Sequence, residues 1–447
     1  MKKFLMAALG GTLAGTILTT QIAGPLLAQD EARNGSVYEQ LDLFGDVFER
    51  IRSNYVEEVN ESDLIEAAIN GMLQSLDPHS SFLPPKEAED MREHTRGSFG
   101  GLGIEVTQKE GWVEVVSPMD GTPAFEAGIQ SGDIITHVDN ENLFGLTLDE
   151  AVVLMRGPIG SEIIITVVRE GVDEPFDVSI IRDEIKLTAA TVRAVGKTVV
   201  MRLTTFNDQT YPNMADGIEE VVAEMGGLDN VEGFVLDLRN NPGGLVSSAI
   251  AVADAFLEEG EIMSTRGRDP ADSDRVNATA GDLTGGKPLV VLINGGSASS
   301  SEIVSGALQD HHRAIVVGEL SFGKGSVQSL MPLRGDGLMR LTTARYYTPS
   351  GRSIQALGIS PDIVVEQPPV KPVSDEEENP AIDRFNRSEA DLRGALDNDS
   401  LTEDERNQII AQQEATEEAA KLREEDFQLS YAVDLLKGLS AFSMAAE

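Results

Sequence analysis

The stretch that decides the fold is Leu289–Glu302, which reads LVVLINGGSASSSE. Its first five residues are all aliphatic, and such a run predicts a strand buried on both faces, as in a parallel sheet covered by helices. Asn294-Gly295-Gly296 then ends the strand, and residues 300–309 follow with helical periodicity. A buried strand that passes through a turn of small residues into a helix is typical of α/β proteins.

The same pattern recurs on both sides and defines an α/β region over about residues 184–370. Further strand runs and helical segments alternate there: strands at Thr198–Leu203, Gly233–Leu238 and Ala314–Val317, and helices at Ala215–Met225 and Ser247–Phe256. Alternating strands and helices predict a mostly parallel or mixed sheet with helices over it.

Two regions precede the α/β region. Residues 36–95 carry apolar residues at helical spacing, with Pro84-Pro85 as a break, and predict a helical N-terminal region. Residues 96–183 begin with a glycine cluster, and an Ala-Gly-x-x-x-Gly-Asp turn follows at 127–133. We expect a short sheet there with two small helices.

The C-terminal residues 371–447 differ in composition from the rest. Asp375-Glu-Glu-Glu378 follows Pro368-Pro369 and predicts a solvated acidic linker. Apolar residues between Phe427 and Leu439 then recur at helical spacing. The sequence leaves open whether this amphipathic helix packs on the core or on another subunit.

Charge and composition exclude several functions. The chain has 35 Lys+Arg against 75 Asp+Glu, a net charge of −40. This excess of acid argues against nucleic acid or an anionic membrane surface as a partner. Cysteine is absent, so disulfides, a thiol nucleophile and cysteine metal sites are excluded. The acidic clusters lack histidine at ligand spacing, and we predict no metal and no cofactor.

The N-terminus predicts export. Lys2 and Lys3 precede an uncharged, mostly apolar run over residues 4–22, and Ala28 is a suitable last residue before a cut. This pattern is that of a signal peptide over residues 1–28 and favours the bacterial periplasm. An uncleaved anchor is the alternative, because the run approaches the ~20 residues that a membrane span needs.

A glycine-rich segment, Gly318–Lys324, resembles a phosphate-binding loop in its spacing. The following residue is Gly325, where such a loop needs a serine or threonine hydroxyl for magnesium. A nucleotide site is therefore disfavoured.

The serine-rich turn is a candidate for nucleophilic chemistry. Ser297, Ser299, Ser300 and Ser301 lie where the buried strand passes into a helix, and a helix N-terminus favours negative charge nearby. Serine is also a preferred helix cap, so an ordinary capping turn explains the segment equally well. Nothing local selects one serine.

A serine nucleophile needs a base. His311 and His312 follow the next helix at a distance of ~12 Å from the serines, which disfavours a Ser–His pair. Lys324 is the alternative, since Ser–Lys pairs are known and burial lowers the pKa of a lysine. The competing interpretation is an ordinary surface lysine.

Residues 96–183 resemble a PDZ domain of the circularly permuted bacterial kind. The resemblance rests on Gly101-Leu102-Gly103-Ile104 and on the turn at 127–133. It implies that the backbone amides of residues 101–104 bind the C-terminal carboxylate of a peptide, which adds as a strand to the sheet edge.

Over about residues 40–370 the chain resembles the carboxyl-terminal processing peptidases, the tail-specific serine proteases of bacteria and chloroplasts. Three features carry the resemblance: the PDZ domain before the core, Asp237-Leu-Arg-Asn-Asn-Pro-Gly-Gly244, and the serine turn followed by Gly323-Lys-Gly-Ser-Val-Gln328. In that family the catalytic lysine lies 25 residues after the nucleophile, and a glutamine follows four residues later. The resemblance therefore selects Ser299, Lys324 and Gln328.

The resemblance implies that neutral Lys324 takes the proton of Ser299, while Gln328 holds the lysine amine in line. Backbone N–H groups of Ser300 and of Gly243 or Gly244 would bind the oxyanion.

Two positions near that site need comment. The family usually has alanine where this chain has Ser300, a change of little consequence for an amide donor. Glu302 matches a position near the site, and a helix-dipole role explains it equally well.

The implied fold is an α/β (α+β) multidomain protein. It has a helical N-terminal region, a PDZ domain, a core resembling the crotonase and Clp-type folds, and a helical acidic C-terminal tail.

The implied function is a serine endopeptidase that cleaves exported proteins with flexible, nonpolar C-terminal tails. Arg156 is a candidate link between PDZ binding and activity, or else an ordinary surface arginine. The alternatives are a non-catalytic PDZ scaffold or chaperone, and a latent protease activated by a partner. The sequence also leaves open a homo-oligomer and an activating adaptor protein.

Overall fold

A computed structural model describes residues 37–119, 121–368 and 416–444. The predicted signal peptide and most of the acidic linker lie outside these residues. The chain divides into two units, Met1–Phe82 and Leu83–Glu447, which we describe separately. No helix in the described part of the chain is long and apolar enough to cross a membrane.

The first unit is helical in its described part, as predicted. Residues 37–54 form one helix, and α2 (Glu61–Gln74) forms the next. Asn60 caps α2, because its side chain accepts a hydrogen bond from the N–H of Ser62. A short strand, β1 (Ser81–Leu83), follows, which the sequence did not indicate.

The second unit begins with α3 (Pro85–Arg96), which starts at a proline as helices often do. Strands β2 (Ser98–Gly101) and β9 (Asp183–Lys186) then pair as an antiparallel ribbon. The residues between these two strands form an antiparallel sheet. The sheet has the order β3-β4-β5-β7-β8, and β6 pairs with β5. This domain has an apolar core of its own. The strands and helices of this domain are, in chain order, β3 (Ile104–Lys109), β4 (Trp112–Pro118), α4 (Pro123–Glu126), β5 (Ile134–Val138), β6 (Glu141–Asn142), α5 (Leu148–Met155), β7 (Glu162–Val168) and β8 (Phe176–Ile181). The predicted sheet with two small helices is confirmed.

The α/β region contains a mixed six-stranded sheet, as predicted. Its order is β10-β11-β12-β15-β16-β19; β10 is antiparallel to β11, and the other pairs are parallel. The strands are β10 (Ala190–Val195), β11 (Thr198–Leu203), β12 (Gly233–Asp237), β15 (Leu289–Ile293), β16 (Ile315–Gly318) and β19 (Ile363–Val364).

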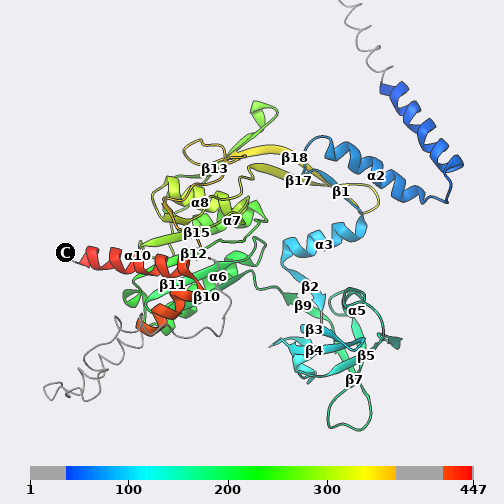
Figure 1. Cartoon of the computed structure of the whole chain (residues 1–447), viewed down its shortest axis with the longest axis horizontal. Helices are drawn as coiled ribbons and strands as arrows, with labels where there is room; N and C mark the ends of the chain where they lie inside the picture. The colour runs from blue at the N-terminus through cyan, green and yellow to red at the C-terminus, as the bar shows by residue number, and fades with distance from the viewer. Residues whose placement is uncertain (1–36, 120, 369–415, 445–447) are drawn as a thin grey trace, which may run out of the picture. The chain divides into compact units, whose positions relative to one another are not determined.

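Helices cover both faces of this sheet, which explains why every residue of its central strands β12 and β15 is buried. The helices α6 (Thr210–Glu224), α7 (Val246–Asp254) and α8 (Ser300–Asp310) share a core with one face. The C-terminal helix α10 (Phe427–Met444) covers the other face, where it lies across the strands in red in Figure 1. The amphipathic helix predicted there therefore packs on the core.

A second, antiparallel sheet of the α/β region was not predicted. It contains β13 (Glu261–Gly267), β14 (Ser273–Asn277), β17 (Ser326–Pro332) and β18 (Leu338–Tyr347). Two short 3-10 turns, η1 (Leu228–Asn230) and η2 (Pro270–Asp272), complete the region. Strand β17 begins two residues after Lys324, so this sheet continues directly from the candidate active-site loop.

Candidate active site

Three loops meet at one edge of the mixed sheet. They follow β12, β15 and β16, which are neighbours in the sheet and run parallel. Parallel strands end at the same edge, and ligands of open α/β sheets bind outside these carboxyl ends. The three loops carry the glycines, the serines and the lysine of the sequence prediction.

Ser299 stands out by its backbone. It is the residue before α8 and has φ 56° and ψ −111°, a conformation that a residue with a side chain rarely adopts. Such strain clusters at functional sites. The side chain is almost buried, and its Oγ lies 2.6 Å from the Tyr346 hydroxyl.

The other three serines of the turn have structural roles. The hydroxyls of Ser297, Ser300 and Ser301 donate to main-chain carbonyls of the segment after β12, at 2.8 to 3.0 Å. All three side chains are fully buried. Within the described residues, Ser299 is thus the serine of this turn whose hydroxyl donates to no main-chain carbonyl.

Glu302 connects the serine turn with the lysine loop. Its carboxylate is fully buried and accepts hydrogen bonds from the N–H of Ser299 at 2.7 Å and the N–H of Lys324 at 2.9 Å. The N–H of Gly323 and the hydroxyl of Ser321 donate to its other oxygen. The sequence left two interpretations of Glu302 open, and it serves both: it completes a capping box and fixes the loop that carries Lys324.

Lys324 is half-buried. Burial and the nearby positive charge of Arg340 lower the pKa of its amine, while the negative charge of Glu302 partly opposes this. Within the described residues the amine has no hydrogen-bond or ion-pair partner. Ser299 and Lys324 are thus linked through their main chains by Glu302, and no hydrogen bond joins their side chains.

Gln328 is held by other partners than the lysine. Its amide nitrogen donates to the hydroxyls of Ser326 at 3.1 Å and Thr342 at 3.0 Å. The expected contact with the Lys324 amine is not among its hydrogen bonds in the described part of the chain. This role of Gln328 stays a prediction.

The glycine loop approaches Ser299 closely. A Cβ atom added to Gly243 would lie 2.8 Å from the Ser299 Cβ and 3.0 Å from the Ser300 nitrogen. The Gly243 N–H donates to Asn241 Oδ1 at 2.9 Å. Among the described residues, the N–H groups of Gly244 and Ser300 donate to no other group. The sequence left open whether Gly243 or Gly244 donates to the oxyanion. The main-chain N–H of Gly244 is the one available for this role.

The Ser300 side chain adds a contact that the sequence did not suggest. Its hydroxyl donates to the Gly244 carbonyl at 3.0 Å and so holds the two candidate oxyanion donors together. An alanine at this position would lack this hydrogen bond.

The predicted peptide-binding segment lines a small pocket in the antiparallel sheet domain. Gly101, Leu102, Gly103 and Ile104 surround about 160 Å³, together with apolar side chains that include Met155. The N–H groups of Leu102 and Gly103 have no acceptor among the residues described. The pocket thus combines free amides, which suit the C-terminal carboxylate of a peptide, with an apolar wall, which suits the side chain of its last residue.

Arg156 lies at the rim of this pocket. Its guanidinium is 4.1 Å from the centre of the Phe99 ring and forms an ion pair of 2.8 Å with Glu93 of α3. It therefore connects the pocket with the helix that precedes the domain. In the described chain no three His, Asp or Glu side chains are grouped to hold a metal ion.

This fold and the serine turn at its sheet edge are those of a serine-type peptidase. The model of peptidase family S41 matches residues 197–365, a PDZ domain model matches 114–169, and the model "Activating protease CtpB N-terminal domain" matches 5–86.

Named relatives agree with these models. A carboxy-terminal-processing protease of Bartonella bacilliformis is 52% identical over 358 residues, which is 80% of this chain and 82% of the relative. A probable CtpA-like serine protease of Staphylococcus aureus is 33% identical over 364 residues, 80% of this chain and 71% of the relative. The solved photosystem II D1 C-terminal processing protease is 30% identical, covers 75% of this chain and 95% of its own, and has a TM-score of 0.42. The chain belongs to peptidase family S41 and is a serine-type, carboxy-terminal-processing peptidase with a PDZ domain.

Proposed function

We propose that this peptidase cleaves polypeptides near their C-termini with Ser299 as nucleophile and Lys324 as general base. The observation that carries the proposal is the state of Ser299: it has a strained backbone, and its hydroxyl is the one in its turn not bound to a main-chain carbonyl. The lowered pKa of Lys324 supports its role, because a base must be neutral to accept a proton.

In this mechanism Ser299 Oγ forms a bond to the scissile carbonyl carbon and its proton passes to the Lys324 amine. The carbonyl oxygen becomes an oxyanion, and the N–H groups of Gly244 and Ser300 donate to it. Protonated Lys324 then gives the proton to the leaving amine, and the C–N bond breaks. Water hydrolyses the acyl-enzyme with Lys324 again as base.

The hydrogen bond between Ser299 and Tyr346 is compatible with this reaction. A hydroxyl has one proton to donate and two lone pairs, so Ser299 can accept from Tyr346 and donate to Lys324. The lysine side chain has to turn toward Ser299, because the two share no hydrogen bond in this structure. This observation favours an enzyme that is latent until a substrate or partner brings the pair together.

We further propose that the pocket at residues 101–104 binds the C-terminus of the substrate. Its free amides suit a terminal carboxylate, and its apolar walls suit a nonpolar last residue. The charged start and apolar run of residues 2–22 support export to the bacterial periplasm. An activating adaptor and a homo-oligomer remain proposals of the same kind.

Cleavage of an unfolded reporter protein with an apolar C-terminal tail tests the proposal. We expect the parent to cleave it, Ser299→Ala and Lys324→Ala to lose activity by a factor of ~10³ or more, and the surface variant Lys197→Ala to act like the parent. A reporter with a charged tail should be cleaved more slowly. Full cleavage by Ser299→Ala would move the nucleophile elsewhere.

A further inference from the structure

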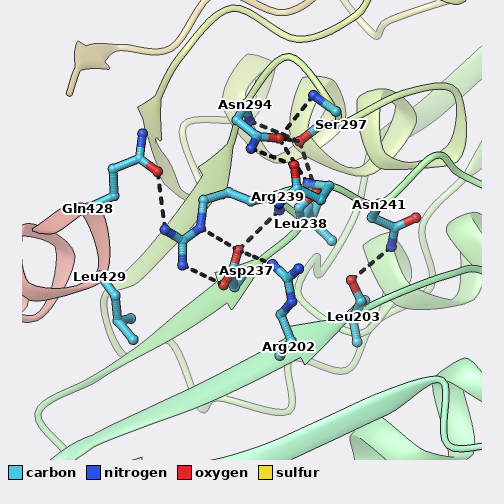
Figure 2. A network of polar contacts seen from close by, with 12 residues as sticks. Arg202, Leu203, Asp237, Leu238, Arg239, Asn241, Asn294, Ser297, Gln428 and Leu429 are labelled. Carbon is cyan, nitrogen blue, oxygen red and sulfur yellow. Dashed lines mark hydrogen bonds and ion pairs between the residues drawn. The ribbon is translucent and has the colours of Figure 1, made fainter. Parts of the chain in front are cut away.

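A buried cluster of charges lies at the sheet edge, on the face opposite the serine turn. Arg239, two residues after β12, has a largely buried guanidinium that binds Asp237 at 2.8 Å and Asp426 at 2.6 Å. It also donates to Gln428 Oε1 at 3.1 Å. Figure 2 shows Arg239 between Asp237 of the strand and Gln428 of the C-terminal helix.

Each charge in this cluster depends on the others. Burial disfavours the Arg239 charge, but the carboxylates of Asp237 and Asp426 outweigh this and raise its pKa. Burial likewise opposes the Asp426 charge, but the hydrogen bonds from Arg239 and the Leu429 N–H, together with the positive charges of Arg239 and Arg202, lower the pKa of Asp426. Arg202 binds Asp237 at 2.8 Å from the neighbouring strand. Removing Asp426 leaves the largely buried Arg239 charge with one carboxylate partner in place of two, and breaking a buried pair is more unfavourable than losing a surface pair.

The segment that carries Arg239 continues directly into the candidate oxyanion loop. Asn240 and Asn294 exchange hydrogen bonds of 2.8 and 2.9 Å across the edge, and Asn240 has a positive φ of 55°. Asn241 donates to the Leu203 carbonyl at 3.0 Å, as Figure 2 shows, and accepts from the Gly243 N–H. Hydrogen bonds thus hold the loop at Asn240, Asn241 and Gly243, between Arg239 and the candidate oxyanion donor Gly244.

We propose that Arg239 and Asp426 are positioning residues of the peptidase. Their ion pair fastens the beginning of α10 to the loop that presents the Gly244 amide, so that this contact, rather than the apolar packing of the helix, sets the geometry of the oxyanion-binding site. The inference rests on the proposed function of Gly244. It assigns the C-terminal segment an indirect part in catalysis, through the loop that carries Gly244.

The variant Asp426→Asn tests this. Asparagine keeps the cap that Asp426 provides for the Leu429 N–H, and it removes the charge that binds Arg239. The matched control is Asp434→Asn on the same helix, where an exposed carboxylate binds Arg423. A second control, Leu436→Ala, weakens the packing of α10 on the sheet without touching Arg239.

We expect Asp426→Asn to lower kcat on the order of tenfold with KM within about twofold, because small misplacements of catalytic groups reduce turnover steeply. Asp426→Glu, which keeps the charge, should recover part of kcat. Asp434→Asn should match the parent, and Leu436→Ala should lower Tm with kcat kept.

Two results would overturn the inference: an unchanged kcat in Asp426→Asn, or a kcat that follows Tm equally in Asp426→Asn and Leu436→Ala. Ser299→Ala is measured alongside. If it retains activity, the proposed function fails; if it is inactive and Asp426→Asn is normal, only the positioning role fails.

Discussion

A hydrogen bond between Ser299 and Tyr346 links the serine turn to the second sheet. The phenol is buried, and burial raises its pKa, so that Tyr346 stays protonated at any working pH. A protonated phenol can donate to Ser299 Oγ, and this donation becomes stronger as the oxygen gains negative charge. Tyr346 would therefore hold Ser299 in place and stabilise the attacking oxygen.

Tyr346→Phe is expected to lower kcat by about ten- to a hundredfold with KM nearly unchanged. The reason is that a hydrogen bond to a charged group contributes about 1.5–3 kcal/mol. Tyr347→Phe is the control, because the neighbouring ring stacks on Arg266 instead. Steady-state kinetics with the apolar-tailed reporter measures both, and a higher kcat in Tyr346→Phe would mean that the contact restrains the serine.

The pH profile depends on Arg340. Burial lowers the pKa of Lys324 first, and the Arg340 charge lowers it further. The proposed mechanism requires neutral Lys324, so kcat/KM should rise with pH through the lowered pKa. In Arg340→Gln the pKa of Lys324 rises, and the rising limb should move to higher pH.

Arg334→Gln, an exposed arginine in the turn before the same strand, is the control for this shift and should leave the limb in place. A limb that stays fixed in Arg340→Gln, or moves to lower pH, would rule out Lys324 as the titrating base.

At the scale of elements, two helices of the described chain begin with the same capping box. In α5 it joins Thr147 and Glu150 at the surface, and in α8 it joins Ser299 and Glu302 in the interior. The two boxes look alike in sequence. Only the one in α8 also binds the loop after β16, through the N–H groups of Gly323 and Lys324.

Glu302→Gln should therefore be far more damaging than Glu150→Gln. An amide NH₂ in place of either carboxylate oxygen would face two hydrogen-bond donors, and we expect the free energy of unfolding to fall by about 3 kcal/mol. The lysine loop should loosen, and kcat should fall with it. Denaturant unfolding and kinetics of both variants decide this; equal effects on stability would show that Glu302 is merely a cap.

The elements themselves differ in how far the sequence predicts them. The core strands were predictable, since β15 is an aliphatic run buried on both faces and β11 is mostly apolar and buried. The sheet of β17 and β18 was missed, because its residues are half-buried without clear alternation. Tyr346 was missed with it: it meets Ser299 from 47 residues away, and no local pattern indicates such a contact.

Across the whole molecule, the prediction of the candidate site rests on the spacing between motifs, because local patterns left the choice of serine open. The resemblance selected Ser299 among four serines. Contacts between distant segments were out of reach: the docking of α10, and the link from Asp426 to Arg239, depend on how an amphipathic helix packs after a long acidic linker.

A free peptide with an apolar C-terminus is expected to raise turnover of a second reporter if the PDZ pocket controls the active site. Arg156→Ala should reduce this stimulation several-fold, because Arg156 joins the pocket rim to Glu93 of α3. The exposed Arg193 supplies the control, Arg193→Ala. Unchanged stimulation in Arg156→Ala would make it an ordinary surface arginine.

The proposed mechanism depends above all on Ser299 as the nucleophile and Lys324 as its base. The most direct measurement is mass spectrometry of the protein after reaction with a fluorophosphonate, which adds covalently to an activated serine. We predict one adduct, on Ser299, with labelling much slower in Lys324→Ala. An adduct on Ser297, Ser300 or Ser301, or labelling of Ser299 at the parent rate without Lys324, would contradict the claim.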